Sequence, residues 1–484
     1  MSAAGLLAVV LTASSGRYGY HRDELYFLAS SKHLAWGYVD QPPLTPLLVR
    51  AMTVMDDRSL PLLRVPATLA AVGVVVVTAL MAREFGGGRR AQLIASFAVV
   101  ASAVVLGAGH LMGTTIFDLL VWATLCLLVI RLCDGRDPRW WLAVGAIVGI
   151  GLQNKTLVVF VVAALLVGIL SVGPRRVLRT WWLAAGIVIA LGIWAPNLWC
   201  QASNGWPQLE MSRSIAAGVS GTSSSRAEFV ITQLGLIGPL LIPVWIAGLW
   251  WLFRSPSSKR WRALGIAYPI LFVVYFGVGG KAYYLAGLYP VLLAAGALVV
   301  SSWSGRGRAR VRLAVVAIAV TSNAVIAAVL FLPVVAPSRL PGSVITAVNY
   351  DAGETVGWPE YVSQVATVRD SLPDDDRGSV AILTANYGEA GAVERFGGRY
   401  GLPLPQSVHN AYWSWGPPSD AAAAVITVGF QRNELRDVFA RVDDAGRLHN
   451  AIGLNNDEQG ASIFVCRGPL EPWSQLWPKI RRLG

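Results

Sequence analysis

Residues 113–132 are GTTIFDLLVWATLCLLVIRL, and this stretch indicates what kind of protein the chain forms. Only two of its residues are charged, Asp118 and Arg131. A helix needs about 20 predominantly apolar residues to cross the hydrocarbon core of a bilayer. The stretch therefore predicts a transmembrane helix with Asp118 near its start and Arg131 near its end.

Apolar stretches of this kind recur along most of the chain. The sequence of 484 residues is 54% hydrophobic and only 14% charged, whereas soluble domains contain about 25% charged residues. These features predict an all-α polytopic membrane core with about 11 transmembrane helices. The stretches are, in round boundaries, 1–17, 64–83, 91–111, 113–132, 140–154, 156–172, 180–200, 229–253, 262–279, 282–302 and 311–335.

The basic residues predict how these helices are oriented. The net charge is +12, but the basic residues fall in short clusters between apolar stretches, so we expect no nucleic-acid partner. By the positive-inside rule, the loops 18–63 and 201–228 and the tail 336–484 lie outside the cytoplasm. The basic loops that alternate with them are Arg83–Arg90, Arg131–Arg139, Arg175–Arg179, Arg254–Arg262 and Arg306–Arg312.

The tail, 336–484, differs in composition from the rest of the chain. It contains the short apolar runs Val380–Leu383 and Ala424–Val428, separated by mixed-charge segments with helical spacing. Strands that alternate with helices are typical of an α/β domain. The sequence thus predicts two domains, a membrane core over 1–335 and an extracytoplasmic α/β domain over 336–484.

The first outer loop, 18–63, has helical features of its own. Leu25, Leu28 and Ala29 recur near helical spacing, which suits a helix in the plane of the membrane interface. Pro42 and Pro43 would end it, and Leu44–Met55 predicts a second short helix.

Ionisable residues of this core gather on one face of the predicted topology. Such groups are costly at membrane depth and mark functional sites. Scattered placement would be expected by chance, so a shared face predicts a single site. The residues are Arg64, His110, Asp118, Lys155 and Lys281, with Asp23, Glu24 and Asp40 in the outer loop.

The charges of these residues suggest a substrate. Two lysines and an arginine can bind a phosphate or diphosphate at the level of a lipid headgroup. A carboxylate beside them can act as a general base or bind a divalent cation. The combination predicts transfer of the group that a lipid phosphate carries.

Each residue also has a purely structural interpretation. The acidic pair would cap a helix, the lysines would contact lipid headgroups in general, and Asp40 would belong to a turn. Arg64 would anchor a helix end, His110 would bond a neighbouring helix, and Asp118 would pair with His110 or a lysine.

Two motifs of the outer loop resemble a known family. Arg22-Asp23-Glu24-Leu25-Tyr26 and Trp36-Gly37-Tyr38-Val39-Asp40-Gln41-Pro42-Pro43-Leu44 resemble the first outer loop of GT-C glycosyltransferases. The most similar group is the protein O-mannosyltransferase and lipid A aminoarabinose transferase-like superfamily, glycosyltransferase family 39. Asp118, Gly151–Lys155 and Lys281–Tyr289 match it further, so the resemblance extends over roughly 18–300.

The resemblance implies a polyprenyl-phosphate sugar donor and an extracytoplasmic site. Asp23, of the Asp23-Glu24 catalytic pair, would deprotonate the acceptor hydroxyl, whose oxygen would attack the anomeric carbon with inversion. Lys155 and Lys281 would contact the lipid phosphate. Arg64 and Tyr284 are assigned to the same donor site, and Asp40, Asp118 and His110 to a divalent metal site.

The chain departs from both subgroups at Gln41. Aminoarabinose transferases have a lysine there and protein mannosyltransferases a histidine, and a neutral glutamine cannot offer the same charge to phosphate.

In the tail, Asn386–Ala390 and His409–Gly416 provide aromatic side chains that would stack on a sugar or an acceptor, or else belong to the domain core.

We therefore predict a multi-pass membrane glycosyltransferase that transfers a hexosyl or pentosyl group to a protein, lipid or glycan acceptor. The alternative is a transporter or flippase that only binds a polyprenyl-linked glycan. A transporter needs ionisable groups near the middle of the membrane or accessible from both sides. Here these groups are expected at one face, which favours the enzyme.

Overall fold

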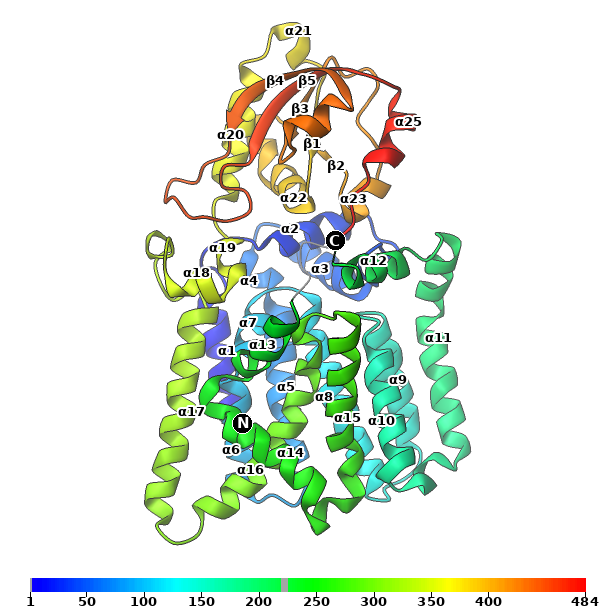
Figure 1. The fold of residues 1–484 in the computed structure, drawn as a ribbon, viewed down its shortest axis with the longest axis vertical. Helices are drawn as coiled ribbons and strands as arrows, with labels where there is room; N and C mark the ends of the chain where they lie inside the picture. Colours follow the sequence, from blue (N-terminus) through cyan, green and yellow to red (C-terminus); the bar gives the residue numbers. More distant parts are fainter. Residues whose placement is uncertain (1, 219–224) are drawn as a thin grey trace. The chain divides into compact units, whose positions relative to one another are not determined.

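The computed structural model describes residues 2–218 and 225–484. The chain forms two compact units (Figure 1). The helical unit comprises Met1–Ser15, Gln41–Thr45 and Pro61–Leu332. The α/β unit comprises Gly16–Asp40, Pro46–Leu60 and Pro333–Gly484, so most of the predicted outer loop belongs with the tail.

Helices occupy the predicted apolar stretches of the helical unit. Within the described residues, six helices are long and apolar enough to cross a membrane, or up to eight if each bent pair is one span. The predicted polytopic helical core is confirmed, although α1, α9 and α10 are apolar helices shorter than a full span. The helices are α1 (Ser2–Ser14), α5 (Val65–Glu84), α6 (Arg89–Val100), α7 (Ala103–His110), α8 (Thr114–Cys133), α9 (Trp140–Leu152), α10 (Val158–Val172), α11 (Trp181–Ser203), α13 (Arg226–Ile237), α14 (Ile242–Arg254), α15 (Arg262–Val278), α16 (Tyr289–Ser304) and α17 (Ala309–Phe331).

Two of the predicted spans are bent. The chain turns by 57° between α6 and α7, and by 79° between α13 and the segment Pro239–Arg254. Gly238, with φ of 101°, and Pro239 explain the second bend, because neither continues a helix readily.

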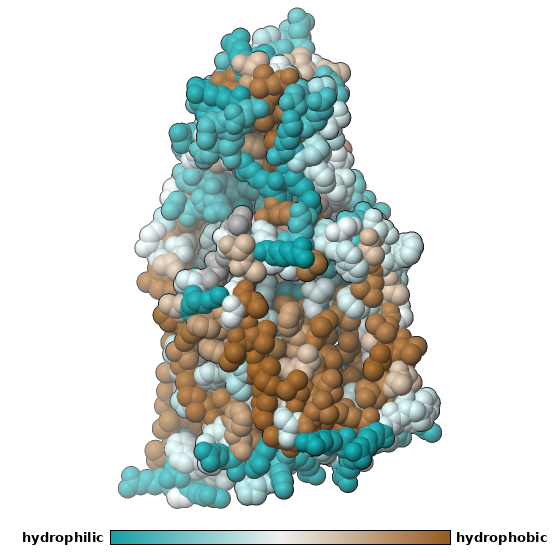
Figure 2. All heavy atoms as spheres, turned by 45° about the vertical axis from the view of Figure 1, so that its right-hand side comes forward, coloured by the Kyte–Doolittle hydropathy of each residue, from teal (hydrophilic) through white to brown (hydrophobic). Residues whose placement is uncertain are grey.

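Glycines bring the helices of this unit close together, and apolar side chains lie on its outer surface. A Cβ on Gly145 would overlap the backbone of Gly186, and one on Gly248 would overlap that of Leu292, so α9–α11 and α14–α16 pack at glycine contacts. On the face drawn in Figure 2, apolar side chains (brown) cover the helices of this unit.

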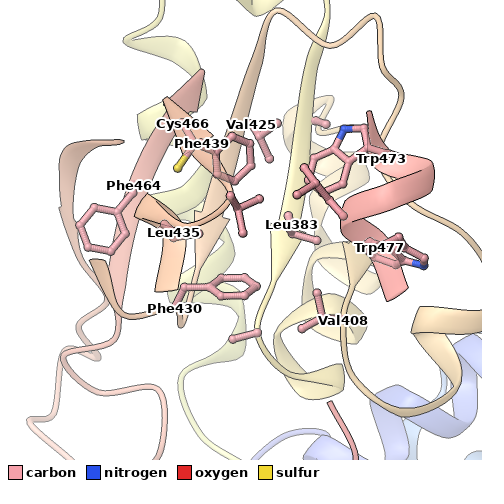
Figure 3. Close-up of a cluster of buried hydrophobic side chains, with 14 residues drawn as sticks. Leu383, Val408, Val425, Phe430, Leu435, Phe439, Phe464, Cys466, Trp473 and Trp477 are labelled. Atoms are coloured by element: carbon pink, nitrogen blue, oxygen red, sulfur yellow. The ribbon is translucent and has the colours of Figure 1, made fainter. Parts of the chain in front are cut away.

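The α/β unit contains a five-stranded sheet of order β2-β1-β3-β5-β4. β1 runs parallel to β2 and β3, whereas β5 runs antiparallel to β3 and β4. Leu383, Val425 and Trp473 are among the buried side chains of its core (Figure 3). The predicted α/β fold of the tail is confirmed. The strands are β1 (Val380–Thr384), β2 (Gln406–Ser407), β3 (Ala424–Val428), β4 (Phe439–Arg447) and β5 (Ser462–Pro469).

The predicted outer-loop helices are present as α2 (Arg22–Lys32) and α3 (Leu44–Met55). Residues Glu24–Ser31 of α2 are buried, and the place of this helix in the plane of the membrane interface stays a prediction. It packs against α22 (Tyr387–Phe396), where a Cβ on Gly391 would lie 2.8 Å from the Cβ of Leu25. The other helices are α4 (Leu60–Leu63), α12 (Pro207–Ala216), α18 (Val344–Val348), α19 (Tyr350–Gly353), α20 (Trp358–Asp370), α21 (Asp374–Arg377), α23 (Asn410–Ser414), α24 (Arg432–Arg436) and α25 (Trp473–Leu476).

Candidate functional site

The Asp23-Glu24 pair opens helix α2 of the α/β unit. Nδ1 of His21, the N-cap residue, accepts a hydrogen bond from the Asp23 backbone N–H, and Glu24 Oε2 accepts one from the His21 N–H at 2.9 Å. Glu24 is fully buried and completes a capping box. The structure thus gives Glu24 a role in the helix cap, and its predicted part in catalysis stays a prediction.

The Asp23 carboxylate is half-buried and has a defined partner. The Tyr387 hydroxyl donates a hydrogen bond of 2.8 Å to Asp23 Oδ1. Tyr387 is the first residue of α22, which follows the carboxyl end of β1. The sheet therefore fixes the position of the group that contacts the predicted base.

Asp40 lies on the same network of tyrosines. Tyr26 donates to Asp40 Oδ1 at 2.9 Å, and the Asn410 side chain donates to Oδ2 at 3.3 Å. The Tyr26 and Tyr387 rings pack at a centroid distance of 4.7 Å. Burial raises the pKa of Asp40 to about 7, although the hydrogen bonds from Tyr26 and Asn410 oppose this shift. Asp40 therefore changes charge near neutral pH.

A buried charge cluster lies beside the base. Arg22 pairs with Glu458 at 2.9 Å, with Asp457 at 2.5 Å and with Glu354 at 3.4 Å. Glu354 and Glu458 are both fully buried. Burial raises the pKa of both glutamates above the ordinary value, and Arg22 opposes this by favouring their ionised forms. The cluster ties the start of α2 to two loops of the tail.

The α/β unit is expected to lose stability as pH rises from 6.5 to 9. Burial lowers the pKa of His21, but Asp351, at 3.4 Å, and other carboxylates raise it from 6.5 to about 9. The ion pair with Asp351 therefore stabilises the unit fully below pH 6.5, and this contribution is lost as pH rises through 9. The Nδ1 cap of α2 requires the neutral ring and opposes this trend. The net loss is about 1 kcal/mol after discounting for the exposure of Asp351. Thermal unfolding of the full chain in lipid nanodiscs at both pH values measures it.

Other buried groups support the same direction. Burial raises the folded pKa of Asp40 and of Glu389 to about 7. Above pH 7 both are ionised and each destabilises the fold, and this destabilisation decreases as they become protonated at lower pH. His409, whose pKa burial lowers to about 4, acts oppositely, but only below pH 6.5. A His21→Asn variant retains an N-cap acceptor and should lose the part of the pH dependence that His21 contributes, while the part from the buried carboxyl groups remains. An unchanged slope would contradict the assignment.

In the helical unit, several predicted donor-site residues lie together. The Lys155 ammonium lies 4.8 Å from the ring centroid of Tyr283 and 5.3 Å from that of Tyr284. It also interacts electrostatically with Asp118, whose Oδ1 accepts a hydrogen bond from Trp122 at 3.0 Å. Lys281 is the N-cap of the short helix η4 (Ala282–Leu288), which carries both tyrosines.

The turn that bears Lys155 is fixed by the segment after Asp40. The Leu44 N–H donates to the Gln153 carbonyl at 2.8 Å, and the Thr45 hydroxyl donates to Asn154 Oδ1 at 3.1 Å. Asn154 in turn bonds the Thr114 carbonyl at the start of α8. The motif Asp40–Leu44 therefore leads directly into the support of Lys155.

Arg64 and His110 form a separate buried contact. Arg64 is fully buried and donates to the Ser15 carbonyl at 2.8 Å, and its Nη1 lies 3.4 Å from Nε2 of His110. These bonds join the ends of α1, α5 and α7. Arg64 thus makes contacts that stabilise the helix ends, and its predicted contact with the donor stays a prediction.

The predicted metal site is not found in the part of the chain that the structure describes. Within residues 2–218 and 225–484, no group of three or more His, Cys, Asp or Glu side chains is placed to hold a metal ion. His110 contacts a guanidinium, and Asp40 already accepts two hydrogen bonds. The assignment of Asp40, Asp118 and His110 to a metal ion is thus not supported by the described residues and stays a prediction.

Comparisons with known proteins agree with this architecture. Residues 40–200 match the sequence family described as dolichyl-phosphate-mannose-protein mannosyltransferase. ArnT from Cupriavidus metallidurans superposes with a TM-score of 0.65 in the apo state, at 14% identity over 96% of this chain and 97% of that one. The chain has the GT-C fold. The resemblance predicted from the sequence is thereby confirmed.

Other GT-C structures are also similar. ArnT bound to undecaprenyl phosphate gives a TM-score of 0.62 at 15% identity, over 96% of this chain and 97% of that one. The oligosaccharyltransferase from Archaeoglobus fulgidus gives 0.52 at 12%, over 84% and 63%. Arabinofuranosyltransferase AftD from Mycobacteria gives 0.53 at 15%, over 96% and 41%. A search of curated proteins finds no significant match.

Proposed function

We propose that this GT-C protein is a membrane glycosyltransferase. It moves a hexosyl or pentosyl group from a polyprenyl-phosphate donor to an acceptor hydroxyl on the extracytoplasmic side. The fold and the mannosyltransferase family match over 40–200 support this class of reaction. The observation that carries the proposal is the Asp23 carboxylate, held by the Tyr387 hydroxyl at the start of a buried helix.

In the proposed reaction, Asp23 is the general base. Its carboxylate takes the proton of the acceptor hydroxyl as the acceptor oxygen attacks the anomeric carbon. The bond between that carbon and the donor phosphate breaks, the phosphate oxygen leaves with the electron pair, and the anomeric configuration inverts. A half-buried carboxylate suits this role, because it is shielded from bulk water yet open to a bound hydroxyl.

The donor phosphate is assigned to Lys155 and Lys281. Lys155 is oriented by Tyr283 and Tyr284 and by Asp118, so its ammonium is fixed close to η4, whose N-cap is Lys281. Two ammonium groups offset the charge of a phosphate monoanion or dianion. The ArnT complex contains undecaprenyl phosphate, and an archaeal oligosaccharyltransferase complex contains dolichol-phosphate, which supports this class of donor.

The positions of the charges favour an enzyme over a transporter. Arg64 precedes α5, His110 ends α7, Asp118 lies in the second turn of α8 and Lys155 follows α9. For consecutive spans that alternate in direction, these positions are at one end of the bundle. A carrier that exposes its substrate alternately to both sides needs such groups at mid-membrane.

A donor-binding experiment tests the proposal. The purified chain in nanodiscs is expected to bind undecaprenyl phosphate, and Lys281→Ala is expected to weaken that binding about tenfold or more, because a charge-assisted contact is lost. Binding is measured by native mass spectrometry with added lipid. Lys259→Ala, in a basic loop predicted on the cytoplasmic side, is the matched control.

Transfer itself is tested with a panel of undecaprenyl-phosphate sugars. Mass spectrometry of cell-envelope glycans and glycoproteins, from cells with and without the gene, identifies the sugar and the acceptor. Unchanged lipid binding in Lys281→Ala would remove this lysine from the phosphate site. Lipid transport without any transfer by the wild-type chain would favour the carrier instead.

A further inference from the structure

We propose that Tyr387 is a positioning residue for the base, an inference that rests on the proposed role of Asp23. Tyr387 is separated from Asp23 by more than 360 residues of sequence, yet its hydroxyl donates directly to Asp23 Oδ1 at 2.8 Å. The hydrogen bond holds one carboxylate oxygen in place. The other oxygen is then oriented toward the acceptor hydroxyl.

The backbone around Tyr387 is fixed by its own helix cap. Asn386 Oδ1 accepts a hydrogen bond from the Glu389 N–H at 2.9 Å, and Glu389 Oε2 accepts from the N–H groups of Ala385 and Asn386 at 3.1 Å. Glu389 is buried, so this capping box is shielded from water. The start of α22 therefore holds Tyr387 as a rigid support.

Close packing fixes the distance between the two helices. A Cβ on Gly388 would lie 3.0 Å from the Cβ of Arg22, and one on Gly391 would meet Leu25. The contact at Gly391, 2.8 Å from the Leu25 Cβ, is too close for a real Cβ atom, so glycine at this position lets α22 come this near to α2. The hydroxyl of Tyr387 can thus reach Asp23 without movement of either helix.

The ring environment keeps the Tyr387 hydroxyl protonated. Burial raises the pKa of Tyr387 well above its ordinary value, and the Asp23 carboxylate raises it further. The ring packs on Tyr26 and stacks on His409 at 4.9 Å. Since burial lowers the pKa of His409 to about 4, this partner is neutral. The Tyr387 hydroxyl therefore remains protonated, and a hydrogen-bond donor, from pH 5 to 9.

Replacement of Tyr387 by phenylalanine is expected to lower kcat about 10- to 100-fold, because the base loses its fixed orientation. The KM for the lipid-linked donor should change little, since Tyr387 belongs to the unit that does not contain the lysines. The hydrogen bond from Tyr387 favours the ionised form of the Asp23 carboxylate. Its loss should therefore move the acid limb of the rate profile to higher pH. Transfer from the undecaprenyl-phosphate sugar found active with the wild type is measured from pH 5 to 9.

Tyr361→Phe is the matched control, because its hydroxyl donates to Asn456 Oδ1 instead, at 2.9 Å. Wild-type kcat and an unmoved acid limb in Tyr387→Phe would overturn the inference. If that variant fails to fold, 3-fluorotyrosine at position 387 keeps the shape and the hydroxyl but is a stronger donor. It should move the acid limb to lower pH, and an unmoved limb would again overturn the inference. A wild-type chain that transfers no sugar would instead count against the proposed function.

Discussion

Asp23→Asn is expected to lower sugar transfer by about 10²- to 10⁴-fold, the usual contribution of a positioned general base. Asparagine has nearly the same shape, and its Oδ1 can still accept the hydrogen bond from Tyr387. It cannot take up the acceptor proton, however. The expected result is therefore a loss of kcat in an intact protein. Single-turnover release of undecaprenyl phosphate from the sugar-bearing donor measures this step directly.

Donor binding distinguishes loss of the base from loss of the site. The lysines assigned to the phosphate belong to the helical unit, whereas Asp23 belongs to the α/β unit, so Asp23→Asn should bind undecaprenyl phosphate as the wild type does. Asp375→Asn, at an exposed position of α21, is the control and should leave both quantities unchanged. Normal transfer by Asp23→Asn would show that another group accepts the proton.

The membrane helices and the sheet could be predicted from local patterns. The length and apolar content of 113–132 predict α8, and Val380–Leu383 predicts most of β1, because each signal lies within the element itself. Positive-inside topology placed Asp118, Lys155 and Lys281 at one face, and the structure brings the first two into electrostatic contact and places Lys281 at the N-cap of η4. The bends within two predicted spans were not predicted, because the two helices of each bent span belong to one apolar stretch of sequence.

The surroundings of the base could not be predicted in the same way. Tyr387 and Asn410 are hundreds of residues from the carboxylates that they contact, and no local spacing reports such a pairing. The spacing of Leu25 and Leu28 predicted the helix itself, but it did not predict the close contact with α22 at Gly391 or the burial of Glu24–Ser31. Glu24 acts through a histidine N-cap, which is outside the usual Ser, Thr, Asp and Asn preference.

Arg22→Met is expected to destabilise the α/β unit by about 3–5 kcal/mol at pH 8, the usual cost of leaving a buried charge without its partner. Arg22 faces two fully buried glutamates, Glu354 and Glu458. Burial raises the pKa of both, and without Arg22 both values rise further. In the variant the two glutamates become protonated as pH falls, which removes the unpaired buried charges. The loss of stability relative to the wild type should therefore be smaller at pH 6 than at pH 8.

Hydrogen exchange in the full chain locates the effect. Peptides from β1 and α22 should lose protection in Arg22→Met, while those from α16 in the helical unit should not. Arg441→Met removes an exposed pair with Asp443 and should cost at most about 1 kcal/mol. The double variant Arg22→Met with Glu458→Gln should recover part of the loss, because a neutral amide replaces one stranded carboxylate. If it recovered nothing, Arg22 would stabilise α2 through the packing of its side chain, and the charge cluster would not be what anchors the helix that carries Asp23.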